Sequence, residues 1–273
     1  MFLALFRASH PGPTVAVTAI AAALSVGANL EAWRIIAITL MVLFNQLSVG
    51  LSNDWLDSAR DHANARKDKP LARGELSVAA VRRSAIAFAI TSIILSLTLG
   101  PLSALANGAL LASGWLYNVG LKATLYSVLP YVVGFGALPL IATFAAAPPL
   151  VAPVWMIAAG SLLGVAAHFS NVLPDLEEDR KTGIRGLPHA VGAPVSAAII
   201  ATSLIAAALA IVFGPGTPLT VLSFLALGLA VSLACVSVIF IVRGQLKRVL
   251  FQLTIVVALS NVLLLVTAPG IGY

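Results

Sequence analysis

Nine stretches of this chain are apolar over about the length that a helix needs to cross a lipid bilayer, which is roughly 20 residues. Short breaks that contain Gly, Pro or charged residues separate them. The stretches comprise residues 12–30, 35–53, 78–99, 101–119, 127–147, 150–173, 189–213, 217–242 and 248–268. Only 10% of the residues are charged, against about 25% in a typical soluble domain, and no polar stretch is long enough for a separate domain. We therefore expect an all-α, polytopic membrane protein in which residues 1–273 form a single transmembrane domain.

Charged residues fall almost entirely on one side of such an arrangement. Fifteen of the 16 Lys and Arg residues lie in the N-terminal tail or around the loops after the second, fourth, sixth and eighth stretches, which leaves only Arg34 opposite. Nine of the 10 Asp and Glu residues follow the same division, with Glu31 as the exception. Because basic residues gather on the cytoplasmic side, we expect a cytoplasmic N-terminus and a multi-pass location in a cell membrane. The Ala-rich stretches are typical of a prokaryotic plasma membrane, and the net charge of +6 reflects topology and a local anion site, with no indication of nucleic-acid binding.

The pattern Asn-x3-Asp-x3-Asp occurs twice, 118 positions apart, each time at the end of an apolar stretch. The first acidic row is Asn53, Asp57 and Asp61, and the second acidic row is Asn171, Asp175 and Asp179. Residues four apart stack on one side of a helix, so each row projects an amide and two carboxylates from one face. Carboxylate oxygens suit Mg²⁺, which proteins bind through one or two carboxylates together with substrate phosphates. The two rows therefore predict a site for a Mg²⁺-diphosphate. Glu177 and Glu178 lie off the aligned face, and solvent-facing charge is the better interpretation for them.

Basic residues follow each acidic row within the same loop. We assign them to the outer oxygens of the diphosphate, because charge-assisted hydrogen bonds from Lys and Arg to phosphate are strong. They are Lys67, Lys69 and Arg73 after the first row, and Arg180 and Lys181 after the second. The alternative interpretation is a pair of solvated loops whose charges only set the orientation in the membrane. The aligned carboxylates argue against it, because they would repel one another unless cations occupied the site.

These residues together resemble a known family. The first motif reads Asn53-Asp54-x2-Asp57-x3-Asp61 with Lys69-Pro70-Leu71 after it, and the second reads Asp175-x3-Asp179 followed by Arg180-Lys181-Thr182-Gly183. With both motifs at the cytoplasmic ends of the second and sixth of nine spans, the chain resembles the UbiA superfamily of intramembrane aromatic prenyltransferases. The resemblance implies nine transmembrane helices bundled around a central cavity that opens sideways to lipid.

The same resemblance implies an activity. A Mg²⁺-dependent prenyltransferase of this kind ionises a (poly)prenyl diphosphate to an allylic cation, and an aromatic or related small-molecule acceptor attacks that carbon as pyrophosphate leaves. The expected partners are thus an isoprenyl diphosphate, the acceptor and the lipid bilayer. The implied metal ligands are Asn53, Asp54, Asp57, Asp61, Asp175 and Asp179. The four Asp residues of the two rows are expected to act in catalysis, and both Asn residues to contact the substrate.

The chain departs from the family pattern at two places. The common Arg-Pro-Leu is Lys69-Pro70-Leu71 here, which keeps a cation but loses the planar fork of a guanidinium. A Tyr/Lys element after the fourth span is matched by Tyr117 and Lys122, with one residue more between them than the family spacing. We assign Lys122 to the diphosphate, although a lone marker of the cytoplasmic side would look the same. Tyr117 is expected to shield the allylic cation with the negative face of its ring, and the alternative is a place in an interfacial aromatic belt.

Polar residues inside the apolar stretches are candidates for binding the acceptor. Gln46 and His168 lie seven and three positions before the start of the nearer acidic row, hence on the same helix face. Polar groups within a membrane usually face the interior of a bundle, and an interhelical hydrogen bond is the alternative for each. That alternative is favoured for Asn45, Asn107, Gln252 and Asn261. In the N-terminal tail, Arg7 and His10 resemble a stretch in which some family members carry a basic residue facing the acceptor, and interfacial anchoring is the simpler explanation.

Two other classes of protein fit part of this pattern. A membrane terpene cyclase of the UbiA type would use the metal and the diphosphate without an acceptor, and a product without added acceptor would identify it. A transporter also combines repeats with polar residues, but its binding site lies near the bilayer midplane. Here the carboxylates lie at the cytoplasmic ends of their helices, which argues against transport.

Overall fold

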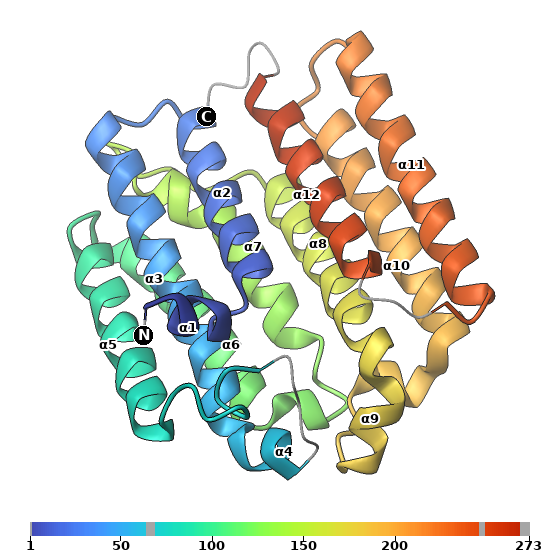
Figure 1. Ribbon diagram of the computed structural model, residues 1–273. Helices are drawn as coiled ribbons and strands as arrows, with labels where there is room; N and C mark the ends of the chain where they lie inside the picture. The colour runs from blue at the N-terminus through green and yellow to red at the C-terminus, as the bar shows by residue number, and fades with distance from the viewer. Residues whose placement is uncertain (1, 64–68, 246–248, 268–273) are drawn as a thin grey trace.

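The computed structural model describes residues 2–63, 69–245 and 249–267, and their regular secondary structure is entirely helical (Figure 1). Each of the nine apolar stretches overlaps one long helix within these residues, as the hydropathy pattern predicts. The long helices are α2 (Pro11–Gly27), α3 (Ala32–Leu56), α5 (Val78–Leu97), α6 (Pro101–Val119), α7 (Leu129–Phe144), α8 (Val154–Val172), α10 (Leu187–Phe213), α11 (Val221–Val242) and α12 (Val249–Thr267). The short ones are α1 (Phe2–Ala8), α4 (Ser58–Ala63), α9 (Leu176–Lys181) and the 3₁₀ helices η1 (Leu121–Ala123) and η2 (Leu173–Asp175).

Five helical segments in the described part of the chain are long and apolar enough to cross a membrane. They are Ala32–Leu56, Val78–Leu97, Val154–Lys181, Leu187–Phe213 and Val221–Val242. Large apolar side chains such as Ile94, Leu105 and Phe224 are more than half exposed on the outside of the bundle, as expected for a surface that contacts lipid. These features fit a multi-pass membrane protein. The count of nine crossings and the cytoplasmic N-terminus stay predictions.

Glycines set the close contact between α7 and α8. Gly160 and Gly164 lie one turn apart on α8, a spacing that lets two helix backbones approach closely in a membrane. A Cβ atom at Gly160 would lie 2.6 Å from the Phe135 carbonyl oxygen, and one at Gly164 would overlap the carbonyl of Tyr131. The contact therefore holds the Tyr131 backbone directly against α8, the helix that leads into the second acidic row.

A helix ends within each acidic row, although the spacing alone predicts that each row lies along one straight helix. α3 ends at Leu56, yet the N–H groups of Asp57 and Asp61 still donate to the carbonyls four residues earlier, at 2.9 and 2.8 Å, so the helical register continues into α4. In the second row α8 ends at Val172 and η2 carries Pro174, which lacks the N–H that a regular helix needs. Pro174 therefore interrupts the helix within the second row, and α4 and α9 lie at the same end of the bundle (Figure 1).

Candidate active site

The two acidic rows meet at one cavity of about 590 Å³. All six of their residues belong to its lining: Asn53, Asp57, Asp61, Asn171, Asp175 and Asp179. The remaining wall comes from the segment before α2, from α2, α3, α6, α7, α8 and α12, and from residues of α4, the loop after it, η1 and α10. Segments more than 100 positions apart in the chain thus direct their carboxylates into a common space, as the repeated spacing predicts.

Lys69 neutralises the first acidic row from the loop after α4. Its Nζ lies 2.9 Å from Oδ1 of Asp54 and 2.9 Å from Oδ2 of Asp61, and all three side chains are largely buried. Burial by itself lowers the pKa of this ammonium group, but the two carboxylates outweigh that effect and raise the pKa of Lys69 above its ordinary value. Lys69 therefore carries a positive charge inside the cavity. The Lys that replaces the family's Arg still provides a cation there.

Asp57 is neutralised by two further cations. Nζ of Lys122, on η1, lies 2.5 Å from Asp57 Oδ1, and Nη2 of Arg60, on α4, lies 2.8 Å from Asp57 Oδ2. Asn53 Nδ2 also donates to Asp57 Oδ2 at 3.2 Å. Burial is the larger influence on Lys122 and lowers its pKa, although Asp57 opposes the effect. The extra residue between Tyr117 and Lys122 thus does not keep the ammonium group from the acidic row.

The second acidic row has far less neutralising charge. Within the part of the chain that the structure describes, the closest ionisable partner of Asp179 is the imidazole of His189, with 3.7 Å between Nε2 and Oδ2. The side chain of Asp175 forms no hydrogen bond or ion pair with the described residues. Asn171 Nδ2 donates to the hydroxyl of Tyr131 at 3.4 Å. Two carboxylates with so little compensation mark the side of the cavity where a bound cation is most favourable.

The donor chemistry of the cavity fits Mg²⁺, although not as a closed cage. The polar groups of the two rows are carboxylate and amide oxygens, which a hard divalent cation prefers. Among the described residues, no three carboxylates, imidazoles or thiols are close enough to hold an ion by themselves. This geometry agrees with Mg²⁺ bound through one or two carboxylates and completed by water and phosphate oxygens.

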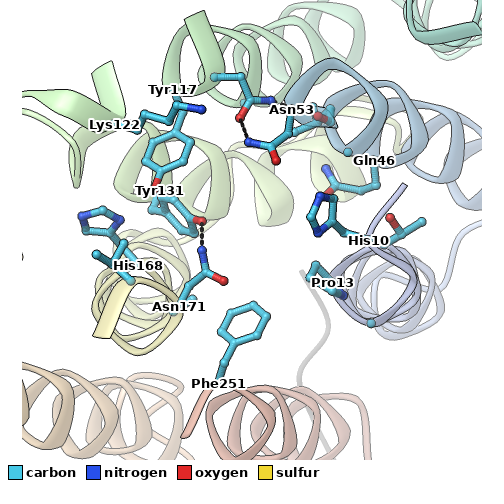
Figure 2. A pocket seen from close by; sticks show the side chains of 18 of the residues that line it. His10, Pro13, Gln46, Asn53, Tyr117, Lys122, Tyr131, His168, Asn171 and Phe251 are labelled. Carbon is cyan, nitrogen blue, oxygen red and sulfur yellow. Dashed lines mark hydrogen bonds between the residues drawn. The ribbon is translucent and has the colours of Figure 1, made fainter. Parts of the chain in front are cut away.

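Aromatic rings form the wall beside the acidic rows. The ring centroids of Tyr117 and Tyr131 are 5.3 Å apart, and those of Tyr131 and His168 are 5.0 Å apart. Figure 2 shows these three side chains on one side of the cavity, together with Lys122. His168 is fully buried, and its Nε2 lies 3.0 Å from the hydroxyl of Ser127. Tyr117 is therefore placed within the cavity, where its ring can face a bound substrate.

The opposite wall carries His10 and Gln46 (Figure 2). Nε2 of His10 lies 3.2 Å from Asp54 Oδ1, and the His10 backbone has φ 55° and ψ 70°, a left-handed conformation that is uncommon for a residue other than Gly. The segment before α2 can reach this place because residue 50 is Gly. A Cβ at that position would overlap the carbonyl of Ser9. Glycine at position 50 thus allows the N-terminal segment to pack against α3 at the cavity.

Some predicted contacts lie elsewhere. Arg73, Arg180 and Lys181 are not part of the cavity lining: Arg73 pairs with Glu75 at 2.9 Å, and Arg180 Nη2 donates to a backbone carbonyl on α10. Their assignment to the diphosphate therefore has no geometric support here. The prediction for Lys67 falls outside the described residues. Gln46 and His168, the two candidates for binding the acceptor, do line the cavity.

Several lining residues are absent from the predicted site, among them Arg60, Asn118, Tyr131 and His189. Arg60 lies among other loop charges and His189 lies at the start of a helix, and for such residues the spacing does not predict where the side chain points. Asn118 directly follows Tyr117, and its buried side chain accepts a hydrogen bond from Asn53 Nδ2 at 3.2 Å while donating to Ser52 Oγ at 2.8 Å. It thus fixes the amide that begins the first acidic row. Its position next to Tyr117 was the signal in the sequence.

The fold and the site define a polytopic helical membrane protein with one cavity lined by two acidic rows. The sequence profile described as the UbiA prenyltransferase family matches residues 14–267, and the chain belongs to that family. Over 199 residues it is 30% identical to the bacteriochlorophyll synthase 33 kDa chain of Rhodobacter capsulatus. That match covers 65% of this chain and spans 63% of the length of the relative.

Solved structures of UbiA homologues share the fold. A UbiA homologue from Archaeoglobus fulgidus bound to GPP and Mg²⁺ superimposes with a TM-score of 0.73 at 15% identity, covering 97% of this chain and 100% of that one. The apo structure of a UbiA homologue from Aeropyrum pernix K1 gives a TM-score of 0.76 at 18% identity, over 91% of this chain and 94% of that one. A digeranylgeranylglyceryl phosphate synthase structure gives 0.67 at 13% identity, over 96% and 98%. At these identities the likeness establishes the fold.

Proposed function

We propose that this protein is a Mg²⁺-dependent prenyltransferase that moves a prenyl group from a prenyl diphosphate to an aromatic or related small-molecule acceptor within the membrane. The observation that carries the proposal is the convergence of both acidic rows on a single cavity. Family membership and the ligands of the Archaeoglobus fulgidus homologue, GPP and Mg²⁺, support it.

The diphosphate would lie between the two acidic rows. The groups that would hold Mg²⁺ are the oxygens of Asn53, Asp54, Asp57, Asp61, Asp175 and Asp179. Bound there, Mg²⁺ would neutralise the charge that develops on the departing pyrophosphate. Lys69, Lys122 and Arg60 now pair with the first row, and in the loaded site their N–H groups would be available to the phosphate oxygens.

The prenyl group would lie against the aromatic wall. Tyr117 and Tyr131 line the cavity as an edge-to-face pair, and the negative face of such a ring attracts a cation. The rings would thus stabilise the allylic cation as the carbon–oxygen bond breaks. Exclusion of water by the apolar side chains that share this wall, among them Phe135 and Leu163, would protect the cation until the acceptor attacks.

An acceptor is favoured over internal cyclisation by the polar side chains on the far wall. His10 and Gln46 line the cavity opposite the Tyr117 and Tyr131 rings (Figure 2). A cyclase pocket has to fold only a hydrocarbon chain, for which these two polar side chains would be of no use. A second, polar substrate could form hydrogen bonds with them.

The test is the release of pyrophosphate by purified protein in detergent with Mg²⁺, geranyl diphosphate or longer prenyl diphosphates, and a panel of acceptors. We expect release that requires Mg²⁺ and a product whose mass equals acceptor plus prenyl group. An isoprenoid hydrocarbon or alcohol as the only product, equal with and without acceptor, would instead identify a cyclase. No pyrophosphate release from any prenyl diphosphate would contradict both.

A further inference from the structure

A row of hydrogen-bonded amides runs from the cavity wall into the contact between α3, α5 and α6. Gln46 Nε2 donates to Asn45 Oδ1 at 3.2 Å, and Asn45 Nδ2 donates to Asn107 Oδ1 at 2.8 Å. Asn107 Nδ2 in turn donates to the hydroxyl of Ser92 at 2.9 Å. Asn45, Asn107 and Ser92 are fully buried, whereas Gln46 lines the cavity. The interhelical role predicted for the two Asn residues is thus present, and it connects to the site.

Two backbone carbonyls set the direction of this amide row. Asn45 Nδ2 also faces the backbone oxygen of Asn107 at 3.3 Å, and Asn107 Nδ2 faces the backbone oxygen of Ser92 at 3.4 Å. A backbone carbonyl can only accept, so each Asn has to turn its nitrogen toward it. The reverse orientation of either amide would place two oxygens face to face in a fully buried place, where unpaired polar groups are costly.

The direction of the row decides what Gln46 presents to a ligand. Asn45 Oδ1 can only accept a hydrogen bond, so Gln46 uses one Nε2 proton there. Oε1 of Gln46 forms no hydrogen bond with the described residues. It is not among their fully buried atoms that lack a partner, so a ligand can reach it. The side chain stands beside His10, across the cavity from Tyr117 and Tyr131 (Figure 2). Gln46 therefore presents an oriented carbonyl oxygen, which can accept a hydrogen bond, to the part of the cavity where the prenyl acceptor would bind.

We propose that Gln46 determines specificity for the acceptor, by accepting a hydrogen bond from a hydroxyl or N–H group of that molecule, and that Asn45 and Asn107 hold it in this orientation. The inference rests on the proposed prenyl transfer. It narrows the acceptor to a molecule that carries a donor, such as a phenolic hydroxyl, at the end near Gln46. A diphosphate or a bare carboxylate offers only lone pairs, and Oε1 disfavours both.

The probes are 4-hydroxybenzoate, homogentisate and 1,4-dihydroxy-2-naphthoate, each assayed with geranyl diphosphate and Mg²⁺. The Gln46→Met variant keeps the side-chain volume and removes both polar atoms. We expect its acceptor KM to rise by about tenfold or more, the loss that an enzyme shows when a substrate hydrogen bond is removed, while the KM for geranyl diphosphate changes by less than about twofold. The Asn107→Leu variant should raise the acceptor KM as well, although Asn107 does not line the cavity, because Asn45 can then rotate. Ser92→Ala should leave it unchanged, because the Ser92 backbone oxygen remains.

A methyl ether of each probe separates a hydrogen bond from a merely structural effect. In the wild type, the ether should inhibit with a constant about tenfold above the KM of the parent phenol, and this ratio should fall to about 1 to 2 in Gln46→Met. An unchanged acceptor KM in both Gln46→Met and Asn107→Leu, with active wild-type protein, would overturn this inference and leave prenyl transfer standing. A wild type that consumes geranyl diphosphate but prenylates no acceptor would overturn both.

Discussion

Lys69 and Lys122 occupy the first acidic row in different ways. Lys69 is held between two carboxylates, which raise its pKa, whereas Lys122 faces one carboxylate and burial lowers its pKa. Both side chains come from segments outside the long helices, so they can turn toward a phosphate without moving the bundle. We infer that a bound diphosphate would draw both ammonium groups toward its oxygens, because each already lies beside the carboxylates of the first motif.

Lys122 is expected to contribute directly to diphosphate binding. Replacing it with Met removes one charge next to Asp57 and should lower kcat/KM for geranyl diphosphate by roughly 10²-fold, in the range seen when a preorganised electrostatic contact is lost. Steady-state pyrophosphate release measures the change. Arg243→Met, which removes an exposed charge at the end of α11, serves as the control and should change kcat/KM by less than about twofold. Equal activity of the two variants would contradict the role of Lys122.

Spacing along the chain predicted the acidic rows but not their supporting contacts. Residues four apart share a helix face, so the repeated spacing was sufficient to predict that both rows converge. The contacts of Arg60 and Asn118 depend on how α3, α4 and α6 fold against one another, which spacing does not describe. The same limit explains Arg73 and Lys181, because a basic loop residue can turn either toward the cavity or toward water.

The helices themselves were predictable because each coincides with an apolar stretch bounded by Gly, Pro or charge. α6 begins at Pro101, directly after Gly100, and α3 begins beside the charged Glu31. α1 was not predicted as a helix, because seven residues before a Pro-rich turn are too few to show a clear period. Its position follows from packing against α3, a contact between segments far apart in the chain.

Gly50 is expected to control how the N-terminal segment packs on α3. A Cβ at position 50 would overlap the Ser9 carbonyl, so Gly50→Ala should lower stability by about 1–3 kcal/mol or push the segment that carries His10 away from the cavity. Thermal unfolding in detergent and the rate of trypsin cleavage at Arg7 report the two outcomes.

Gly108 provides the matched control on α6. A Cβ there would meet nothing within 4 Å, and Ala is the better helix former by about 0.5–1 kcal/mol, so Gly108→Ala should be neutral or stabilising. If Gly50→Ala behaves like Gly108→Ala in both assays, the close contact between the N-terminal segment and α3 is refuted.

The charge distribution predicts the orientation of the whole protein in the membrane. In a Cys235→Ala background, which removes the one native thiol, single cysteines at the exposed positions Glu31 and Glu177 should react with an impermeant maleimide from opposite sides. On intact cells we expect labelling at position 31 only, and labelling at position 177 after the membrane is opened. Labelling of both positions on intact cells would contradict nine crossings with a cytoplasmic N-terminus.

Because the acidic rows converge, the proposed diphosphate site lies at one end of the bundle. Asp57 directly follows α3 and Asp175 belongs to η2, and the two are joined by a cavity and not by any direct bond in the described residues. Mg²⁺ and a diphosphate would therefore be the link between the two halves of the site. Energetic coupling between Asp57 and Asp175 should exist only in the presence of that ligand.

Isothermal titration with Mg²⁺ and the unreactive analogue geranyl S-thiolodiphosphate tests this coupling most directly. The proteins are the wild type, Asp57→Asn, Asp175→Asn, the double variant, and Glu177→Gln as a control beside the second row. We predict that each single change weakens binding, that Glu177→Gln does not, and that the double variant loses less than the sum of the single losses by about 0.5–3 kcal/mol, as for groups that contact one ligand. Losses that add within about 0.5 kcal/mol, or an Asp175→Asn variant that binds like the wild type, would show that the two rows do not hold a common Mg²⁺-diphosphate.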